Sequence, residues 1–401
     1  PKTHHAMRAP FVALLTILLV CLAADAYIYV QLRRRCKSRF WPLVQLVSAL
    51  LLLGMMIVEM CLLPKQIGEK QLLGKMWLLY TYLSIYLPKY VAILFDLIAS
   101  LPRLWHRHRI KWLTATGIGA AVVIFAAMWW GALINRFNID VTHVDVPVPG
   151  LPASMNGLRI VQFSDLHTGT FGRDTTFTSE LIDSINAQHA DVIVFTGDIV
   201  NRHSGEMEPF VRTLSRLHAP MGVYAILGNH DYGDYFNWPA PQIKQANMQL
   251  LYDLYKQTGI RLLRNETVWL RRGADSLALI GVENIGEPPF TTYGSLRRAY
   301  PNLSDSIPKV LLSHNPRHWT DSIATDPAAN VALTLSGHTH AMQIEIGKWS
   351  PSAWRYDTWG GMYTDDAHRQ LYVNIGAGTV GMPMRIGATP EITVITLHSI
   401  P

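Results

Sequence analysis

Five short motifs of this 401-residue sequence carry the residue types that metal binding and proton transfer use. The motifs are SDLHTG (164–169), TGDIVNR (196–202), LGNHDYG (227–233), SHNP (313–316) and SGHTH (336–340). Their candidate residues are Asp165, His167, Asp198, Asn229, His230, His314, His338 and His340. Taken singly, each residue is as typical of a turn or of a structural histidine as of a metal site. Together they supply carboxylate, amide and imidazole groups without sulfur, a set that suits two divalent ions.

Each motif directly follows an apolar run of strand length, and this placement predicts where the polar groups meet. In open α/β sheets, ligands bind outside the carboxyl ends of the strands. Glycines at positions 197, 228 and 337 precede the polar residues, as expected where the backbone turns tightly. An extended D-x-H or H-x-H points both side chains to one side, and one carboxylate can bridge two ions ~3.5–4 Å apart. We therefore expect a dinuclear metal site at the edge of a sheet.

The strands that must position these motifs are predicted from apolar runs in residues 139–401. They cover 158–164, 191–197, 222–228, 276–282, 309–314, 331–337, 370–376 and 391–397. Several runs are continuous rather than alternating, which is typical of strands covered on both faces. Helical patterns at 175–188, 206–218 and 241–259 fall between the early strands, and residues 268–280 are typical of a β-hairpin. This order predicts an α/β fold in which sheets lie between layers of helices.

The first third of the chain is predicted to be a helical membrane region. Four apolar stretches each reach the ~20 residues that cross a bilayer core. They cover 10–31, 40–63, 72–101 and 112–134. A cleaved signal peptide accounts for one such stretch but not for four. The expected organisation is therefore a transmembrane region at 1–138 of about four spans, followed by one large domain at 139–401.

The charges divide unevenly between these two regions. Residues 1–138 hold 16 Lys+Arg and 4 Asp+Glu (+12), and residues 139–401 hold 19 and 25 (−6), which together give the net +6. An acidic second domain argues against nucleic-acid binding, because such domains gather basic residues. The basic loops at 33–39 and 103–111 are expected to face the cytoplasm. We therefore predict a multi-pass protein of the cell (inner) membrane whose catalytic domain is extracytoplasmic.

Cysteine and charge placement narrow the chemistry further. All three cysteines lie before residue 62, so residues 139–401 contain no thiol nucleophile and no cysteine zinc ligand. Charged residues within the predicted spans are costly in lipid, and four of them are candidate functional groups. They are Asp25, Glu59, Lys89 and Asp96.

The order D-x-H, G-D, G-N-H-D, a lone His and G-H-x-H resembles the motif pattern of the calcineurin-like metallophosphoesterase superfamily. The resemblance covers about residues 155–400 and implies a four-layer α/β/β/α sandwich of two mixed sheets. It also implies two divalent metal ions bridged by Asp198. The first ion would bind Asp165, His167 and His340, and the second Asn229, His314 and His338.

The resemblance further implies hydrolysis of a phosphoester by attack of a metal-bridging hydroxide. His230 would face the phosphate and the leaving group, and Asp231 would orient or polarise His230. The expected substrate is a phosphodiester or a pyrophosphate in a phosphorylated small molecule or a lipid. The metal stays open among Mn, Fe and Zn, and the oligomeric state stays open as well.

Within that superfamily the chain looks most similar to the membrane-associated, YkuE-like phosphodiesterase branch, whose C-terminal signature resembles residues 371–397. That branch often has GHTHGGQ where this chain has GHTHAMQ (337–343). Arg202 and Arg385 are further candidates for phosphate or headgroup contact, although Arg385 is equally compatible with a surface position. The aromatic segment 348–363 is compatible with a lid, a lipid-facing rim or a loop packed on the core.

Two functions are compatible with these expectations. The first is a membrane-anchored, dinuclear-metal phosphohydrolase. The second is a membrane sensor or transporter whose outer domain binds a phosphorylated ligand without turnover. The lipid bilayer is the expected partner of the first third, and no nucleic-acid partner is expected. Turnover by residues 139–401 distinguishes the two functions.

Overall fold

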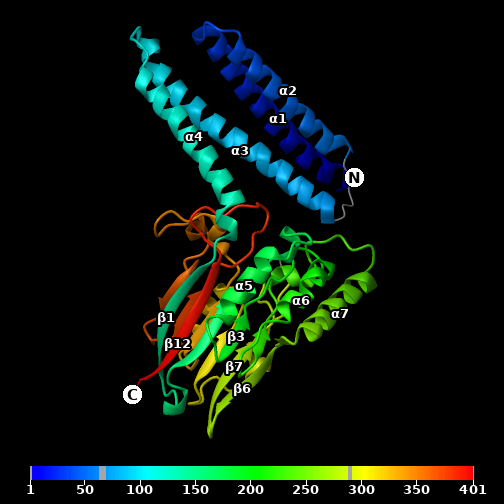
Figure 1. Ribbon diagram of the computed structural model, residues 1–401, viewed down its shortest axis with the longest axis vertical. Coiled ribbons are helices and arrows are strands. Elements are labelled where there is room, and N and C mark those ends of the chain that lie inside the picture. Colours follow the sequence, from blue (N-terminus) through cyan, green and yellow to red (C-terminus); the bar gives the residue numbers. More distant parts are fainter. Residues whose placement is uncertain (1, 63–68, 288–290, 401) are drawn as a thin grey trace. The chain divides into compact units, whose positions relative to one another are not determined.

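The computed structural model describes residues 2–62, 69–287 and 291–400, and internal contacts divide the chain into two units, Pro1–Trp130 and Gly131–Pro401. Figure 1 shows long helices in the first unit and packed sheets and helices in the second. The division falls slightly before the predicted boundary at residue 138, because the last turn of the fourth long helix belongs by its contacts to the second unit.

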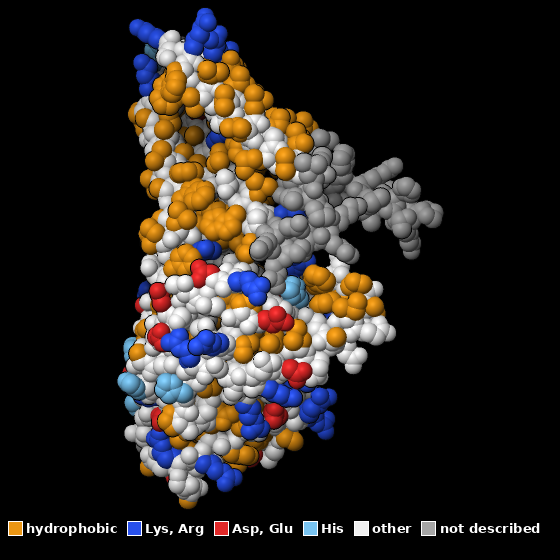
Figure 2. Space-filling view, turned by 45° about the vertical axis from the view of Figure 1, so that its right-hand side comes forward, with side chains coloured by type: hydrophobic (Ala, Val, Ile, Leu, Met, Phe, Trp, Pro, Cys, Tyr) orange, Lys and Arg blue, Asp and Glu red, His pale blue; other side chains and the backbone are white. Residues whose placement is uncertain are grey.

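Four long apolar helices make up the membrane region. They are α1 (Lys2–Arg35), α2 (Phe40–Leu62), α3 (Glu69–Ser100) and α4 (Lys111–Leu133). Each contains a segment that is long and apolar enough to cross a membrane, which confirms the prediction of a multi-pass protein. Lys and Arg side chains gather at the end of this unit where α1 turns into α2 and α3 turns into α4 (Figures 1 and 2).

Charged residues within these helices pair with one another. The Lys89 ammonium lies 2.6 Å from the Asp25 carboxylate, and the Arg35 guanidinium lies 2.8 Å from Asp96. Pairing offsets much of the cost of placing charge among apolar helices. The packing of α1 against α3 thus pairs these charges within the helical unit. The side chain of Glu59 lies outside the described residues.

Two six-stranded sheets form the frame of the second unit. The first has the order β1 (Asp140–Pro149), β12 (Glu391–Ile400), β2 (Leu158–Phe163), β3 (Val192–Phe195), β4 (Val223–Ala225) and β5 (Arg261–Leu262). The second has the order β10 (Gly361–Thr364), β11 (Gln370–Val373), β9 (Leu333–Ser336), β8 (Lys309–Leu312), β7 (Asp275–Gly281) and β6 (Glu266–Arg272). Each sheet contains parallel and antiparallel pairs, so both are mixed.

Helices cover the outer face of each sheet. On the first sheet lie α5 (Thr176–Asn186), α6 (Val211–Leu214) and α7 (Pro241–Thr258), and on the second lie α8 (Leu296–Ala299) and a π-helical turn (Trp319–Ile323). The inner faces of the two sheets pack on each other through fully buried side chains such as Val194 and Leu279. These layers confirm the predicted four-layer α/β/β/α sandwich.

All eight predicted strands and the predicted hairpin are present, whereas strands β1, β5 and β10 were not predicted and one predicted helix differs from expectation. Strand β1 was not predicted, because its side chains alternate and it contains two prolines; it lies at a sheet edge, where proline is tolerated. The predicted helix at 206–218 is wrong in most of its length. Residues Ser204–Phe210 form 3₁₀ turns that contain Pro209, and only Val211–Leu214 is α-helical.

Candidate metal centre

The loops that carry the five motifs leave neighbouring strands at the same edge of each sheet. Strands β2, β3 and β4 are parallel neighbours in the first sheet, and β8 and β9 are parallel neighbours in the second. The carboxyl ends of parallel strands meet at one edge, so the five loops converge where the two sheets lie face to face. The predicted clustering of the motifs at strand ends is therefore present in the fold.

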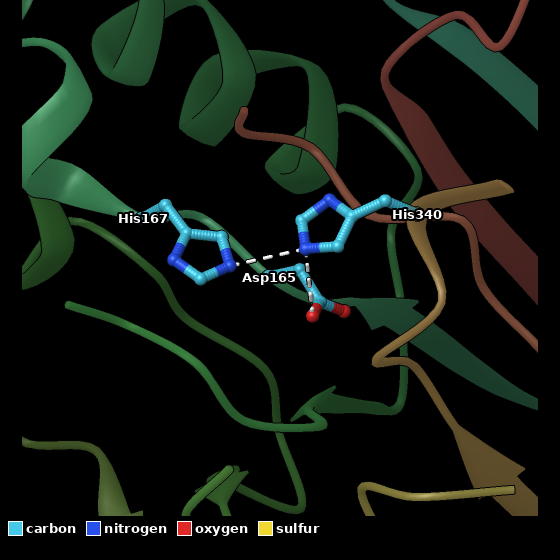
Figure 3. A group of neighbouring side chains, drawn as sticks. All are labelled: Asp165, His167 and His340. Atoms are coloured by element: carbon cyan, nitrogen blue, oxygen red, sulfur yellow. Dashed lines mark hydrogen bonds and ion pairs between the residues drawn. The ribbon is translucent and has the colours of Figure 1, made fainter. Parts of the chain in front are cut away.

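The first donor group consists of Asp165, His167 and His340, all of them buried. The Nε2 atoms of His167 and His340 lie 3.0 Å apart, and Nε2 of His340 lies 3.2 Å from an oxygen of Asp165. Figure 3 shows both rings and the carboxylate pointing toward one another, with Asp165 and His167 on the loop after β2. Three residues expected to hold one ion therefore meet.

The second donor group consists of Asp198, His314 and His338, with Asn229 beside it. Nε2 of His314 lies 3.2 Å from Oδ2 of Asp198, 3.1 Å from the amide oxygen of Asn229 and 3.3 Å from Nδ1 of His338. Oδ2 of Asp198 also lies 3.7 Å from Nε2 of His167 in the first group. One carboxylate oxygen therefore faces both groups, as a bridging ligand must.

The donor set fits divalent cations. In a metal site with metal–nitrogen distances of ~2.0–2.1 Å, ligand atoms around one ion lie about 2.9–3.4 Å apart. The separations within both groups fall in this range, at 3.0–3.3 Å. Nδ1 of His314 lies 2.8 Å from the Thr196 carbonyl and donates to it, which directs the lone pair on Nε2 toward the centre.

The electrostatic environment favours the ionised form of Asp198 and the neutral forms of His338 and His167, which are the protonation states that can bind a cation. The pKa of Asp198 lies well below its usual range because His314, His230 and His167 together outweigh its burial. Burial lowers the pKa of His338 to about 4 and holds that of His167 well below the ordinary range. His314 is the exception, because the Asp198 carboxylate outweighs burial and raises its pKa to about 9. Cation binding must therefore displace a proton from His314.

The backbone of the site is strained where the ligands are. Asp165, His167, Asp198, His338 and His340 all have positive φ, between 47° and 78°. Such a conformation costs an L-residue on the order of 1 kcal/mol, and it clusters at functional sites. Gly228 allows the loop that carries Asp198 to pack closely against it, since a Cβ at position 228 would collide with Oδ1 of Asp198. The loops thus direct the side chains of the donor groups toward the centre.

His230 lies beside the centre and outside both donor groups. Its ring contacts that of His167 edge-on, with centroids 4.9 Å apart, and stacks on Tyr235 at 4.3 Å. Its Nδ1 lies 2.7 Å from the Asn201 carbonyl and donates to it. Because Nδ1 carries this proton, Nε2 is left to bind or exchange a proton with a ligand.

Asp231 does not take the position expected of it. Its carboxylate accepts hydrogen bonds from the backbone N–H groups of Gly228, Asp198, Ile199 and Val200. Among the described residues, the contact that orients the His230 ring comes from the Asn201 carbonyl. Asp231 therefore fixes the loop that carries Asp198, and its predicted role of orienting His230 is corrected. The physical reason is that four converging N–H groups outcompete one imidazole for a buried carboxylate.

Of the two candidate arginines, Arg385 is placed differently from expectation, and Arg202 is not tested. Arg385 is fully buried and donates to the carbonyls of Gly378, Ala388 and Ile375, so it is neither a surface residue nor a phosphate contact. Its Nη2 lies 3.3 Å from Nδ1 of His340, behind the first donor group. The Arg202 guanidinium lies over the Phe236 ring at 5.1 Å, and its phosphate contact stays a prediction.

A cleft of about 290 Å³ beside the second donor group is lined by Asn229 and His338 and by further residues that the sequence analysis did not select as candidates. They include Tyr235, Asn284, Glu287, Asn315, Arg355 and Tyr356. The Tyr356 hydroxyl lies 2.9 Å from Nε2 of His338. The sequence analysis did select the aromatic segment 348–363, but on account of its tryptophans. It did not single out Arg355 or Tyr356 within that segment.

Two family models match the chain. One, described as the transmembrane domain of a probable calcineurin-like phosphoesterase, matches residues 7–136. The other, described as calcineurin-like phosphoesterase, matches residues 158–342. Together they cover the membrane helices and most of the sandwich.

Individual relatives agree with these models. A transmembrane protein with a metallophosphoesterase domain from Bos taurus is 32% identical over 274 residues, which are 65% of this chain and 57% of that protein. The uncharacterized metallophosphoesterase YkuE of Bacillus subtilis is 32% identical over 277 residues, 65% of this chain and 86% of that protein. UDP-2,3-diacylglucosamine pyrophosphatase LpxG of Chlamydia trachomatis is 27% identical over 256 residues, 54% of this chain and 74% of that protein. The match thus spans little more than half of the bovine protein.

Proposed function

Because the chain belongs to the calcineurin-like metallophosphoesterases, as a multi-pass membrane protein with a metal-dependent phosphoesterase domain, we propose that it hydrolyses phosphodiester or pyrophosphate bonds at two divalent ions. The observation that carries the proposal is Oδ2 of Asp198, which lies 3.2 Å from a donor of the second group and 3.7 Å from a donor of the first. A carboxylate between two complete donor groups is the arrangement that two-metal hydrolysis requires.

Each residue of the centre has a role in this proposal. Asp165, His167 and His340 would hold one ion, Asn229, His314 and His338 the other, and Asp198 both. Bound there, the ions would activate water and neutralise charge on the phosphoryl oxygens. His230, oriented by the Asn201 carbonyl, would donate a hydrogen bond or a proton to the leaving oxygen through Nε2.

The cleft supports a polar leaving group on the substrate. Its walls present amide groups from Asn284 and Asn315, phenols from Tyr235 and Tyr356, and the Arg355 guanidinium. Such groups suit a phosphorylated sugar or nucleoside better than an apolar tail. The name of the chlamydial relative describes a pyrophosphatase of a nucleotide-linked, acylated sugar, which supports a lipid-linked pyrophosphate as the substrate class here.

We test this proposal with the full-length protein and a soluble aryl phosphodiester in the presence of Mn²⁺. Asp198→Asn is expected to lower both bound metal and kcat/KM by on the order of 100-fold or more, since loss of a bridging ligand exceeds loss of an outer partner. His230→Ala is expected to keep its metal and to lower kcat by ~10²–10⁴-fold. The exposed His218→Ala is the matched control and should behave as wild type.

Metal-independent and equal rates in all four proteins would contradict the proposal and favour a sensor or transporter without turnover. The metal itself is identified by loading the metal-free protein with Mn, Fe or Zn separately and measuring the same rate.

The proposed side of the membrane is extracytoplasmic. It is supported by the basic loops at 33–39 and 103–111, whose charge favours the cytoplasmic side and therefore an extracytoplasmic end of the fourth span. An alkaline phosphatase fused after residue 401 is expected to be active, because that reporter needs an oxidising compartment. An active cytoplasmic reporter at the same position would instead place the domain inside.

A further inference from the structure

An unusual group of exposed hydrophobic side chains follows the last ligand motif. We call residues 342–354 the rim. Within it Met342 is 48% exposed, Ile346 66%, Trp349 42% and Trp354 80%. Large apolar side chains gathered in one segment of a domain surface mark an interaction site, whereas scattered ones need no explanation.

The rim is a built element whose apolar side chains are held outward. Ile346 and Trp349 pair across a tight turn that carries Gly347 and Lys348 at its tip. The rings of Trp349 and Trp354 meet edge-on at 5.5 Å. Between them, buried Ser350 and Ser352 hydrogen-bond to the carbonyls of Ala341 and Thr339. The serines attach the segment to the ligand loop, so its tryptophans cannot turn into the core.

The base of the rim lies next to the end of the last membrane span. Ile386 donates its N–H to the Gln343 carbonyl and accepts from the Glu345 N–H, both at 2.8 Å. The preceding residue, Arg385, donates its N–H to the Gly131 carbonyl at 3.1 Å and accepts from the Asn135 side chain at 3.0 Å. Gly131 and Asn135 belong to the fourth candidate span, Lys111–Phe137. Two consecutive residues thus connect the rim to the last residues of the fourth candidate span.

From this placement we propose that the rim is seated in the interface of the same bilayer that the fourth span crosses. Tryptophan prefers the boundary between headgroups and acyl chains, because its ring is apolar while its N–H needs a polar partner. Ile346 and Met342 add apolar area, and Lys348 at the tip suits the phosphate layer. The surface fits a lipid bilayer rather than a folded protein partner, because a bilayer is present wherever the span is inserted.

This placement would bring the catalytic cleft to the lipid surface. The rim begins two residues after His340 and ends beside Arg355 and Tyr356, which line the cleft. Tyr356 in turn contacts His338 through its hydroxyl. The inference rests on the proposed function in one respect: the substrate would be a phosphate ester or pyrophosphate carried by a lipid that stays in the bilayer.

A depth measurement tests the rim without relying on activity. The full chain, with its three cysteines replaced by serine, receives a single cysteine at Trp354, is labelled with a fluorophore and is placed in lipid nanodiscs. The matched control is the same label at Trp269 on β6, whose side chain is 42% exposed, as is that of Trp349. Spin-labelled lipids should quench the label at 354 at least twofold more than the label at 269. Equal quenching at the two positions would overturn the proposal.

A second measurement uses the unlabelled enzyme with its native cysteines. Trp349→Ser combined with Trp354→Ser is expected to lower kcat/KM for a phosphodiester lipid in vesicles by about tenfold or more, and to leave hydrolysis of a soluble aryl phosphodiester within twofold of wild type. Trp269→Ser should change neither rate. An equal loss on both substrates, or a loss on neither, would overturn the rim as a lipid contact. If wild type hydrolysed neither substrate, the proposed function would fail, whereas the quenching result would still decide the rim.

Discussion

At the scale of single residues, three of the four histidines in the donor groups have a partner at the ring nitrogen that does not face the centre. Nδ1 of His314 meets a backbone carbonyl, Nε2 of His338 meets the Tyr356 hydroxyl, and Nδ1 of His340 faces Arg385. An accepting partner fixes the ring and raises its basicity, whereas the Arg385 guanidinium can only donate to Nδ1 of His340. Nδ1 of His167 is buried and, among the described residues, has no hydrogen-bond partner.

Tyr356→Phe therefore tests whether this outer partner matters. We expect the affinity of the second donor group for Mn²⁺ to fall ~10–100-fold, because His338 loses the acceptor of its Nε2–H. The measurement is a metal titration followed by calorimetry, which needs no substrate. Tyr300→Phe, which removes a hydroxyl bonded to Asp305 away from the centre, is the control. Unchanged affinity in Tyr356→Phe would show that the ring is held by packing alone.

At the scale of elements, the loop after β9 has positive φ at three successive residues, none of which is glycine. Ala341, Met342 and Gln343 have φ of 52°, 45° and 60°, where the related branch often has Gly-Gly-Gln. This loop therefore adopts the left-handed conformation at three successive residues without a glycine. The left-handed conformation costs each L-residue ~1 kcal/mol or more, and the buried Ala341 methyl offsets part of that cost by filling space.

Two substitutions at Ala341 should separate these effects. Ala341→Gly is expected to leave the free energy of unfolding within about 1 kcal/mol, because relieved strain and the lost methyl oppose each other. Ala341→Val should destabilise by ~2 kcal/mol or more, since a β-branched residue is a genuine outlier at positive φ and overpacks a buried site. Thermal unfolding in detergent measures both. Similar melting temperatures for the two variants would contradict the strain argument.

In the last turn of α4, close packing restricts which residue can occupy position 131. A Cβ on Gly131 would lie 2.8 Å from the Arg385 carbonyl oxygen and 2.9 Å from Cγ1 of Ile386. A Cβ on Gly119, earlier in the same helix, would meet no other part of the described chain within 4 Å. The two glycines therefore differ in packing while sharing a helix.

Opposite effects are expected when each is changed to alanine. Gly131→Ala should destabilise by ~1–3 kcal/mol through overpacking, whereas Gly119→Ala should be neutral or stabilise by up to about 1 kcal/mol through helix propensity. Melting temperatures of the full chain in detergent compare them. A stable Gly131→Ala would mean that the segment Arg385–Ile386 moves aside easily, and it would weaken the argument that places the rim.

At the scale of the whole molecule, the ions proposed to act in catalysis should also raise the free energy of unfolding. The donor groups join loops from both sheets, and five of their members have strained backbone. Ions that bind only the folded state stabilise it by about 2.7 kcal/mol at one hundred times their dissociation constant. For a unit of this size that corresponds to a fall of roughly 5–10 °C in melting temperature when the ions are removed.

Calorimetry before and after chelation measures this effect. The unfolding transition of the sandwich should shift downward and recover when Mn²⁺ is added back. The Asp198→Asn variant is the control, because its transition should respond little to either treatment. If the melting temperature of the wild-type protein did not change on chelation, the loops would hold their strained geometry without ions.

The sequence by itself determined the four spans, the eight recognised strands and the residues that meet in the two donor groups. Apolar length and strand-like runs are local properties, and the five motifs sit at strand ends whatever the loops do in detail. The tertiary structure alone decided that Asp231 binds backbone amides, that Arg385 is buried, that Tyr356 contacts His338 and that the rim points outward. Those outcomes depend on contacts between residues far apart in the chain and on positive φ at individual positions. Neither quantity is encoded in spacing or composition, because the direction of a loop side chain is set by what packs against it.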